Sequence, residues 1–296
     1  YHLELQRLGY ETAHIGKWHM GNDGKPRPGY DFWVAYDGHG RLFDPKLNEN
    51  GTYVRRQGYV TDIMNEMAVA FVKKKHSKPW SLWFAHKAVH PDAEQAADGT
   101  FRMDGYRPAE RHKDLYRGCV FPKKPNMLPA EAIIKQKPAW AEALALRRNK
   151  QSREMLDAIH AGTQEEIRLR AAMMASVEEG VGMLFEALEN TGQLDNTFIL
   201  FLGDNGYFFG EHGLGPERRF AYEEGIRSPF IARFPKRIGA GTRIAELVLC
   251  QDVAPTLIEL AGGKPGPQIQ GRSLLPLFAG KRAGWRKSFL IEYWAE

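Results

Sequence analysis

The chain has 296 residues, of which 43% are hydrophobic and 26% are charged, and its net charge is +5 with a pI near 9.1. This composition is typical of an ordinary soluble globular protein of one or two domains. The basic residues are spread along the chain and no aromatic-basic RNA-binding motif stands out, so we predict no nucleic-acid partner. No apolar run reaches about 18 residues, so we predict no membrane-spanning helix.

The first predicted elements lead to a Lys-His pair. A short amphipathic helix over residues 3–8 ends at Gly9, and Tyr10–Ile15 reads as a strand. If the chain stays extended beyond it, Lys17 and His19 point the same way because side chains alternate with period two. Such a pair could bind an anion and transfer a proton, although a surface turn between glycines would look the same.

The next segment delivers a second set of cationic and imidazole side chains. Asn22–Gly58 is predicted to be irregular with short strands, followed by a helix capped by Thr61 or Asp62 and running to about His76. Trp80–Ala85 is predicted to be a buried strand.

The sequence HKAVHP follows that strand. His86, Lys87 and His90 therefore lie at its carboxyl end, although a histidine there could equally be packed or on the surface. Residues from Pro91 to about Gln164 are polar and partly helical, and insertions of this kind often shape substrate choice.

The clearest helix is predicted over Glu165–Asn190, where apolar residues recur every three to four positions. It leads into Thr197–Leu202, which we predict to be a strand buried on both faces. Asp204 and Asn205 follow directly, and their oxygens suit Ca²⁺ or Mg²⁺. An Asn-Gly turn is the alternative interpretation of this loop.

The last part of the chain is predicted to hold a strand at Phe230–Phe234, a short helix at Asp252–Gly262 and a possible strand at Ser288–Tyr293. Cys119 and Cys250 have no metal-ligand spacing, so two buried thiols or one disulfide are both open.

We expect the polar residues at these strand ends to meet at one edge of a sheet, because ligands bind in the crevice outside the carboxyl ends of strands. The combination of a metal half-site with cations and imidazoles suits hydrolysis of an oxyanion ester. No serine nucleophile elbow, Walker loop or HExxH motif competes with it. The residues are Lys17, His19, His86, Lys87, His90, Asp204, Asn205, His212, Arg218 and Arg219.

Six blocks of the sequence, in order, resemble the type I sulfatases of the alkaline phosphatase superfamily. They read GYETAHIGKWHMG, HKAVHPD, GDNGYFFGEHGL, YEEGIRSPF, QDVAPTLIELAG and QGRSLLPL. The resemblance implies an α/β fold, with a mixed, mostly parallel sheet between helices. It also implies a catalytic domain over residues 1–250 and the start of a small C-terminal α+β subdomain over residues 251–296.

The resemblance also implies roles for individual residues. Asp204 and Asn205 would be two ligands of the family's Ca²⁺, with Mg²⁺ less expected. Lys17 and His19 would hold the sulfate and a formylglycine hydrate. His90 would contact the leaving-group oxygen as the general acid.

Further substrate contacts are expected from neighbouring residues, namely His86, Lys87, His212 and Arg218. Arg218 would stand where sulfatases usually carry a sulfate-binding Lys. An Arg keeps the charge but cannot donate a proton at neutral pH, which shifts the burden of protonation to His90.

The family's nucleophile is a formylglycine made in a C/S-x-P/A-x-R motif, and neither Cys119 nor Cys250 lies in one. We therefore expect a truncated sulfatase that lacks its nucleophile block, further metal ligands and a central strand. We expect this chain alone to be inactive, and poorly soluble through exposed sheet edges.

Two other functions stay open. A phosphodiesterase or phosphonate monoester hydrolase of the same superfamily would share the fold, and a degenerate homologue could bind sulfated glycans without cleaving them. The expected ligand is a sulfated small molecule or glycan, with a sulfated carbohydrate preferred. Family resemblance implies a periplasmic, extracellular or lysosomal location, and the oligomeric state is left open.

Overall fold

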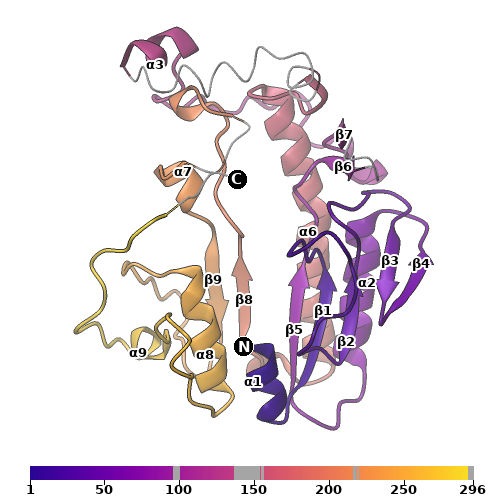
Figure 1. Cartoon of the computed structure of the whole chain (residues 1–296), viewed down its shortest axis with the longest axis vertical. Coiled ribbons are helices and arrows are strands. Elements are labelled where there is room, and N and C mark those ends of the chain that lie inside the picture. Colours follow the sequence, from indigo (N-terminus) through magenta and orange to yellow (C-terminus); the bar gives the residue numbers. More distant parts are fainter. Residues whose placement is uncertain (96–100, 137–153, 155–156, 216–217, 219, 293–296) are drawn as a thin grey trace.

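A computed structural model describes residues 1–95, 101–136, 154, 157–215, 218 and 220–292 of the chain. Runs of strands and single helices make up the first part of the chain, and short strands between helices make up the rest (Figure 1). The elements are α1 (His2–Arg7), β1 (Glu11–Gly16), β2 (Phe32–Ala35), β3 (Lys46–Glu49), β4 (Thr52–Arg55), α2 (Val60–Lys73), β5 (Trp80–Ala85), β6 (Asp92–Gln95), β7 (Phe101–Gly105), η1 (Glu110–His112), α3 (Ala130–Gln136), α6 (Gln164–Asn190), η4 (Leu194–Asn196), β8 (Ile199–Leu202), η5 (Glu211–Gly213), α7 (Glu223–Ile226), β9 (Phe230–Arg233), η6 (Cys250–Asp252), α8 (Val253–Leu260) and α9 (Leu275–Phe278).

The largest sheet has the strand order β4-β3-β2-β1-β5. Its inner strand β1 pairs in parallel with both β2 and β5, while β2-β3 and β3-β4 are antiparallel. Two antiparallel ladders, β6-β7 and β8-β9, accompany it. The predicted class, an α/β protein whose mixed sheet has a parallel centre, is confirmed.

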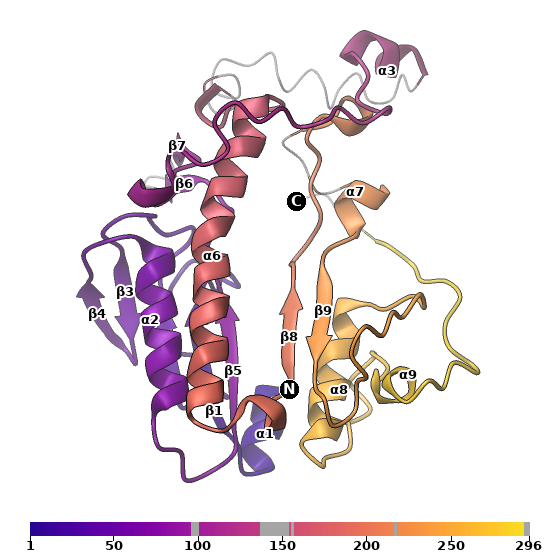
Figure 2. The ribbon, with the colours of Figure 1, turned by 180° about the vertical axis from the view of Figure 1, so that it is seen from behind.

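Two helices cover one face of the five-stranded sheet. Figures 1 and 2 show α2 and α6 side by side on that face and α1 on the other. Met64 and Ala68 of α2 are fully buried with Ile15 of β1 and Met173 of α6. Burial of such side chains contributes roughly 1.5–3 kcal/mol each. The stripe of apolar residues at three- to four-residue spacing is what made these helices predictable.

The helix boundaries differ from the prediction at the N-terminus of α2. The helix begins at Val60 after Tyr59, and neither Thr61 nor Asp62 is its cap. Thr61 is instead fully buried inside the first turn. For α6, Thr163 is the N-cap, and its hydroxyl accepts a hydrogen bond from the backbone N–H of Glu166 at 3.2 Å.

Three other expectations are wrong. The strand β8 is half-buried along its length, not buried on both faces, because β9 is its partner in the described part of the chain. Residues 288–292 form no strand, and Tyr293 lies outside the described residues. Cys119 and Cys250 are both exposed free thiols. Among the helices that the structure describes, none is long and apolar enough to cross a bilayer.

Gly16 is required where β1 approaches the end of β5. Its φ is +123°, and a Cβ on this residue would lie 1.9 Å from the carbonyl oxygen of Ala85. The next residue donates its backbone N–H to that same oxygen at 2.8 Å. The two strands can therefore meet at this level only if residue 16 has no side chain.

We expect Gly16→Ala to lower the free energy of unfolding by about 3 kcal/mol, combining left-handed strain with a backbone clash. The matched control is Gly210→Ala, because Gly210 has a similar φ of +120° but no heavy atom within 4 Å of the added Cβ. It should cost about 1 kcal/mol. Urea unfolding measures both, and equal losses would contradict the close-approach argument.

Candidate active site

The site begins where two parallel strands end together. The register pairs Glu11 with Trp80 and continues to Gly16 with Ala85. Because the strands are parallel and end at the same level, the segments that follow them leave the sheet at the same edge. The sequence places Lys17 and His19 on one segment and Lys87 and His90 on the other, and the structure brings both segments together.

Trp18, between Lys17 and His19, packs among aromatic rings. Its ring lies 5.3 Å from that of His14, 5.1 Å from Trp33 and 5.5 Å from Trp83, measured between centroids, in edge-to-face geometry. Such aromatic contacts contribute roughly 0.5–1.5 kcal/mol each beyond burial. Trp18 is thus held in an aromatic cluster between Lys17 and His19 in the sequence.

The backbone differs from the extended chain predicted here. The strand ends at Gly16, and His19 has a left-handed φ of +47°. Lys17 and His19 nevertheless share a site, because the positive charge of Lys17 is one cause of the lowered pKa of His19.

Lys17 is the centre of the charge distribution. The pKa of its amine is lowered to about 8, chiefly by burial; the carboxylate of Asp204 acts in the opposite direction, and the guanidinium of Arg218 adds to the lowering. Lys17, Arg218 and Asp204 come from three separate segments of the chain. The segments that follow β1 and β8 are therefore near enough for Asp204 and Arg218 to act on the pKa of Lys17.

Three imidazoles form a line beside Lys17. The ring centroid of His39 lies 4.4 Å from that of His19, edge-to-face, and 4.7 Å from that of His90, stacked. His39 comes from the turn between β2 and β3, which sequence reasoning treated as an irregular excursion. The signal that could have found it is the GHG sequence, a histidine held between two glycines.

The pKa of each of the three rings is lowered, which favours the neutral imidazole. Burial, followed by the charges of Lys17 and Lys87, lowers the pKa of His90 to about 2, and burial with neighbouring cations lowers that of His39 to about 4. The Nδ1 atom of His90 lies 2.9 Å from the carbonyl oxygen of Pro91 and must donate to it. Its Nε2 is therefore an acceptor before an anion binds.

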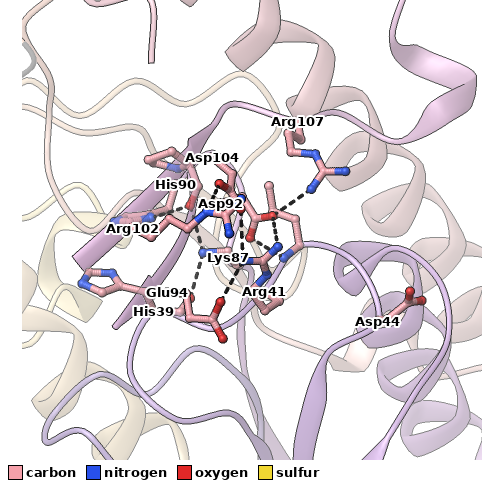
Figure 3. Close-up of polar contacts among 12 residues, drawn as sticks. His39, Arg41, Asp44, Lys87, His90, Asp92, Glu94, Arg102, Asp104 and Arg107 are labelled. Carbon is pink, nitrogen blue, oxygen red and sulfur yellow. Dashed lines mark hydrogen bonds and ion pairs between the residues drawn. The ribbon is translucent and has the colours of Figure 1, made fainter. Parts of the chain in front are cut away.

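Lys87 is almost completely buried, with 2% of its surface exposed. Its Nζ donates to the carbonyl oxygens of His39 at 2.8 Å and Pro91 at 3.0 Å (Figure 3). Burial, and then the charge of Lys17, lower its pKa to about 7, while Asp92 opposes them. These contacts differ from the substrate contact predicted for Lys87, and they fit a clamp that joins two loops of the site.

The loop that carries Asp204 is held on two sides. Gly206 donates its N–H to the carbonyl of Gly225 at 2.9 Å, and a Cβ on Gly206 would lie 2.0 Å from another carbonyl oxygen. On the other side, the hydroxyl of Tyr207 donates to the fully buried carboxylate of Glu166 at 2.6 Å. This contact ties the loop after β8 to the first turn of α6.

The Asp204–Asn205 pair offers oxygens to a hard cation. The carboxylate of Asp204 is exposed, and the Nδ2 of Asn205 donates to the carbonyl of Gly206 at 2.6 Å, which leaves its Oδ1 as an acceptor. The donor set fits Ca²⁺ in chemistry but supplies two of the six to eight ligands that it takes. No group of three or more acidic, His or Cys side chains able to hold a metal occurs within the described ranges.

Two predicted residues make their described contacts elsewhere. The Nε2 of His86 lies 2.9 Å from the Oδ1 of Asn65 on α2, so its ring faces the helix layer. The ring of His212 stacks on Tyr222 at 4.2 Å, and its Nε2 lies 3.2 Å from Glu224. Arg218 is placed beside Lys17 as predicted, and Arg219 lies outside the described residues.

Comparison with known proteins adds to this geometry. The family model described as Sulfatase matches residues 4–263. The chain belongs to the sulfatase family. The resemblance found in the six sequence blocks is thereby confirmed.

Several sulfatases are similar along almost the whole chain. An N-acetylglucosamine-6-O-sulfatase of Bacteroides thetaiotaomicron is 30% identical over 98% of this chain and 59% of its own length. The human N-acetylglucosamine-6-sulfatase is 26% identical over 97% of this chain and 50% of its own. An arylsulfatase of Volvox carteri is 30% identical over 98% and 48%. The chain thus spans roughly half the length of these relatives.

Solved structures share the fold. A protein solved in complex with its substrate, D-glucosamine-2-N,6-O-disulfate, aligns with a TM-score of 0.77 and 28% identity over 100% of this chain and 68% of that one. A phosphonate monoester hydrolase of Agrobacterium radiobacter aligns with a TM-score of 0.67 and 19% identity over 96% and 62%. At that identity the second likeness shows the fold alone.

The aromatic cluster behind Trp18 predicts a dependence of stability on pH. His14 is fully buried, and burial lowers its pKa from 6.5 to about 4. Between these values the unfolded chain binds a proton that the folded protein does not, so stability falls as the pH falls from 6.5 to 4. The difference corresponds to roughly 3 kcal/mol.

We expect His14→Phe, which keeps an aromatic ring in the cluster, to lose about 3 kcal/mol less than the wild type over this range. Part of the pH dependence that remains in this variant comes from His2, because burial lowers its pKa to about 3. Urea unfolding at pH 6.5, 5.5 and 4.5 measures the difference, with His160→Phe at an exposed position as the control. Parallel profiles for wild type and His14→Phe would contradict the prediction.

Proposed function

We propose that this chain is the substrate-binding and proton-transferring part of a sulfuric ester hydrolase that acts on a sulfated carbohydrate. The observation that carries the proposal is the gathering of Lys17 and Arg218 with the imidazoles of His19 and His90 at one edge of the sheet. This edge presents fixed cations and neutral hydrogen-bonding groups to a small oxyanion.

Lys17 lies where an added anion would be stabilised. Burial lowers the pKa of its amine, Asp204 acts against this, and repulsion from Arg218 adds to the lowering, so the positive charge of Lys17 is destabilised overall. Sulfate bound between them would offset that repulsion and raise the pKa of the surrounding imidazoles. Binding would therefore bring His90 nearer to the protonated state that a general acid needs.

We assign the residues as follows. Lys17, Arg218 and His19 hold the sulfate oxygens, and His90 faces the ester oxygen of the leaving group. Lys87 holds the segment that carries His90 in place through the carbonyl of Pro91. Arg218 cannot give up a proton near neutral pH, so protonation of the leaving group falls to His90.

The nucleophile and the metal are part of the proposal. A formylglycine hydrate, provided by a C/S-x-P/A-x-R segment that this sequence does not contain, would supply the attacking oxygen. Asp204 and Asn205 would bind Ca²⁺, which would stabilise the negative charge of that oxygen and of the sulfate. Without that segment we expect this chain to bind sulfate esters but not to cleave them.

The carbohydrate preference is supported by the relatives. Two of those described above are N-acetylglucosamine-6-sulfatases, and one similar structure contains a sulfated glucosamine. For a location outside the cytosol, the support is that other relatives are called extracellular sulfatases.

The second candidate, a phosphonate monoester hydrolase, is favoured by the fold shared with that enzyme. Release rates from matched sulfate and phosphonate esters of one alcohol, measured on the full-length protein, separate the two. Faster release of sulfate supports the proposal, and faster release of phosphonate overturns it. Binding of the sulfate ester without turnover would favour the non-catalytic glycan binder.

Lys17→Met removes the central charge and keeps the apolar stem. We expect it to weaken sulfate binding and any turnover by about 100-fold, the usual loss on removing one charged donor from an oxyanion site. Calorimetry with inorganic sulfate measures binding, and Lys73→Met at the exposed end of α2 is the matched control. Equal loss in both variants would argue for a general charge effect.

Asp204→Asn tests the metal. If Asp204 and Asn205 bind Ca²⁺, adding the ion at about 100 times its Kd should stabilise the wild type by about 2.7 kcal/mol, which chelator reverses. The substitution should abolish that stabilisation, while Asp157→Asn at an exposed position should keep it. Thermal unfolding with Ca²⁺, with Mg²⁺ and with chelator measures it. Undiminished stabilisation of Asp204→Asn would exclude this site.

A further inference from the structure

The turn between β2 and β3 holds one histidine out toward the site. His39 is flanked by Gly38 and Gly40, whose φ angles are +53° and +66°. A Cβ on Gly40 would lie 2.3 Å from the ring of Tyr36, so a side chain there would collide with a buried aromatic. The Gly-His-Gly sequence thus permits a tight turn that presents a single imidazole.

Two cationic clamps fix this turn. The buried Nζ of Lys87 donates to the carbonyl oxygen of His39 at 2.8 Å. On the other side, Arg41 forms ion pairs with Glu94 and Asp104 at 3.1 Å each and with Asp92 at 3.5 Å (Figure 3). The turn is therefore tied both to the segment that carries His90 and to the β6-β7 hairpin.

The carboxylate of Asp92 links the turn that carries His39 to the β6-β7 hairpin. It is fully buried, accepts the backbone N–H of Leu42 at 3.0 Å and pairs with Arg107 at 3.1 Å. Buried ion pairs of this kind hold geometry more than they add stability. They leave the imidazole of His39 with few positions to adopt.

The ring of His39 lies between the rings of two histidines for which we proposed roles above. On one side is His19, assigned to the sulfate oxygens, and on the other is His90, assigned to the leaving-group oxygen. A group between them faces the first atoms of the leaving group. The Nδ1 of His39 is buried, so a ligand would meet the ring at Nε2, which in a neutral imidazole either donates or accepts one hydrogen bond. Either role matches a carbohydrate hydroxyl or amide next to the ester.

We propose that His39 is a substrate-binding residue that recognises a polar substituent next to the sulfate ester, and so selects sulfated carbohydrates over simple aryl sulfates. This inference rests on the proposed function, because it places the sulfate beside Lys17. It assigns to His39 discrimination between leaving groups, and it gives His39 no part in bond breaking.

The test compares three ligands on the whole 296-residue chain by calorimetry: inorganic sulfate, glucosamine-6-sulfate and 4-nitrophenyl sulfate. We expect the wild type to bind glucosamine-6-sulfate more tightly than the aryl ester. His39→Ala should weaken binding of the sugar about tenfold, the effect of a hydrogen bond or two, and change sulfate binding less than twofold. His39→Gln, which keeps a donor and an acceptor, should recover part of the loss.

The outcomes distinguish failure of the proposed function from failure of the inference about His39 alone. A wild type that binds none of the three ligands overturns the proposed function and this inference with it. Sulfate binding with an unchanged sugar preference in His39→Ala overturns the inference alone. An equal loss of sulfate and sugar binding also overturns it, because His39 would then hold the oxyanion.

A second measurement does not depend on a folded variant. In the wild type labelled with ¹⁵N-histidine, glucosamine-6-sulfate should shift the ring nitrogen signals of His39 beyond the shift that sulfate alone produces. Identical shifts with the two ligands would overturn the inference. His160→Ala, at an exposed position, is the control for substitution of a histidine as such.

Discussion

The parallel pairing of β1 with β5 is the constraint on which the site depends. Six consecutive residue pairs are in register up to Gly16 and Ala85, where the lack of a Cβ lets the two backbones close to hydrogen-bonding distance. Strands that run the same way and end together must release their next residues at one place. The pairing of the two strands is therefore enough to bring the Lys17 and His90 segments together.

A site assembled in this way brings several positive charges together, and these cations differ in the groups that surround them. Lys87 is directed into backbone carbonyls, and Arg41 is surrounded by three carboxylates. Lys17 has Asp204 near it but also Arg218. Lys87 and Arg41 hold loops in place, whereas Lys17 stands where we propose that a substrate anion binds. Cations that hold the structure and a cation proposed to bind substrate thus lie close together in one site.

Sequence reasoning predicted the parts of this protein that are encoded locally. The apolar periodicity of α2 and α6 and the apolar run of β5 identify them, and the sheet-edge rule brings Lys17, His90 and Asp204 together. It missed His39 because the turn that carries it has no periodicity, and its role depends on contacts with residues about 20 and 50 positions away. It did not predict the contacts of Lys87 with backbone carbonyls or of His86 with Asn65 for a similar reason. A strand end shows which residues arrive, but only packing shows whether a side chain faces the site, the backbone or a helix.

The charge of the site narrows the choice of substrate. A phosphate monoester carries close to two negative charges at neutral pH, whereas a sulfate ester carries one. Three neutral imidazoles line the site, and each has its pKa lowered by burial and by neighbouring cations. They offer hydrogen bonds without adding charge, which suits a singly charged ester better than a doubly charged one. A phosphonate monoester is also singly charged, so charge alone does not separate it from sulfate. Nor does the leaving group, because esters of one alcohol share it. The contact proposed for His39 bears on which alcohol is accepted, and not on the choice between sulfur and phosphorus.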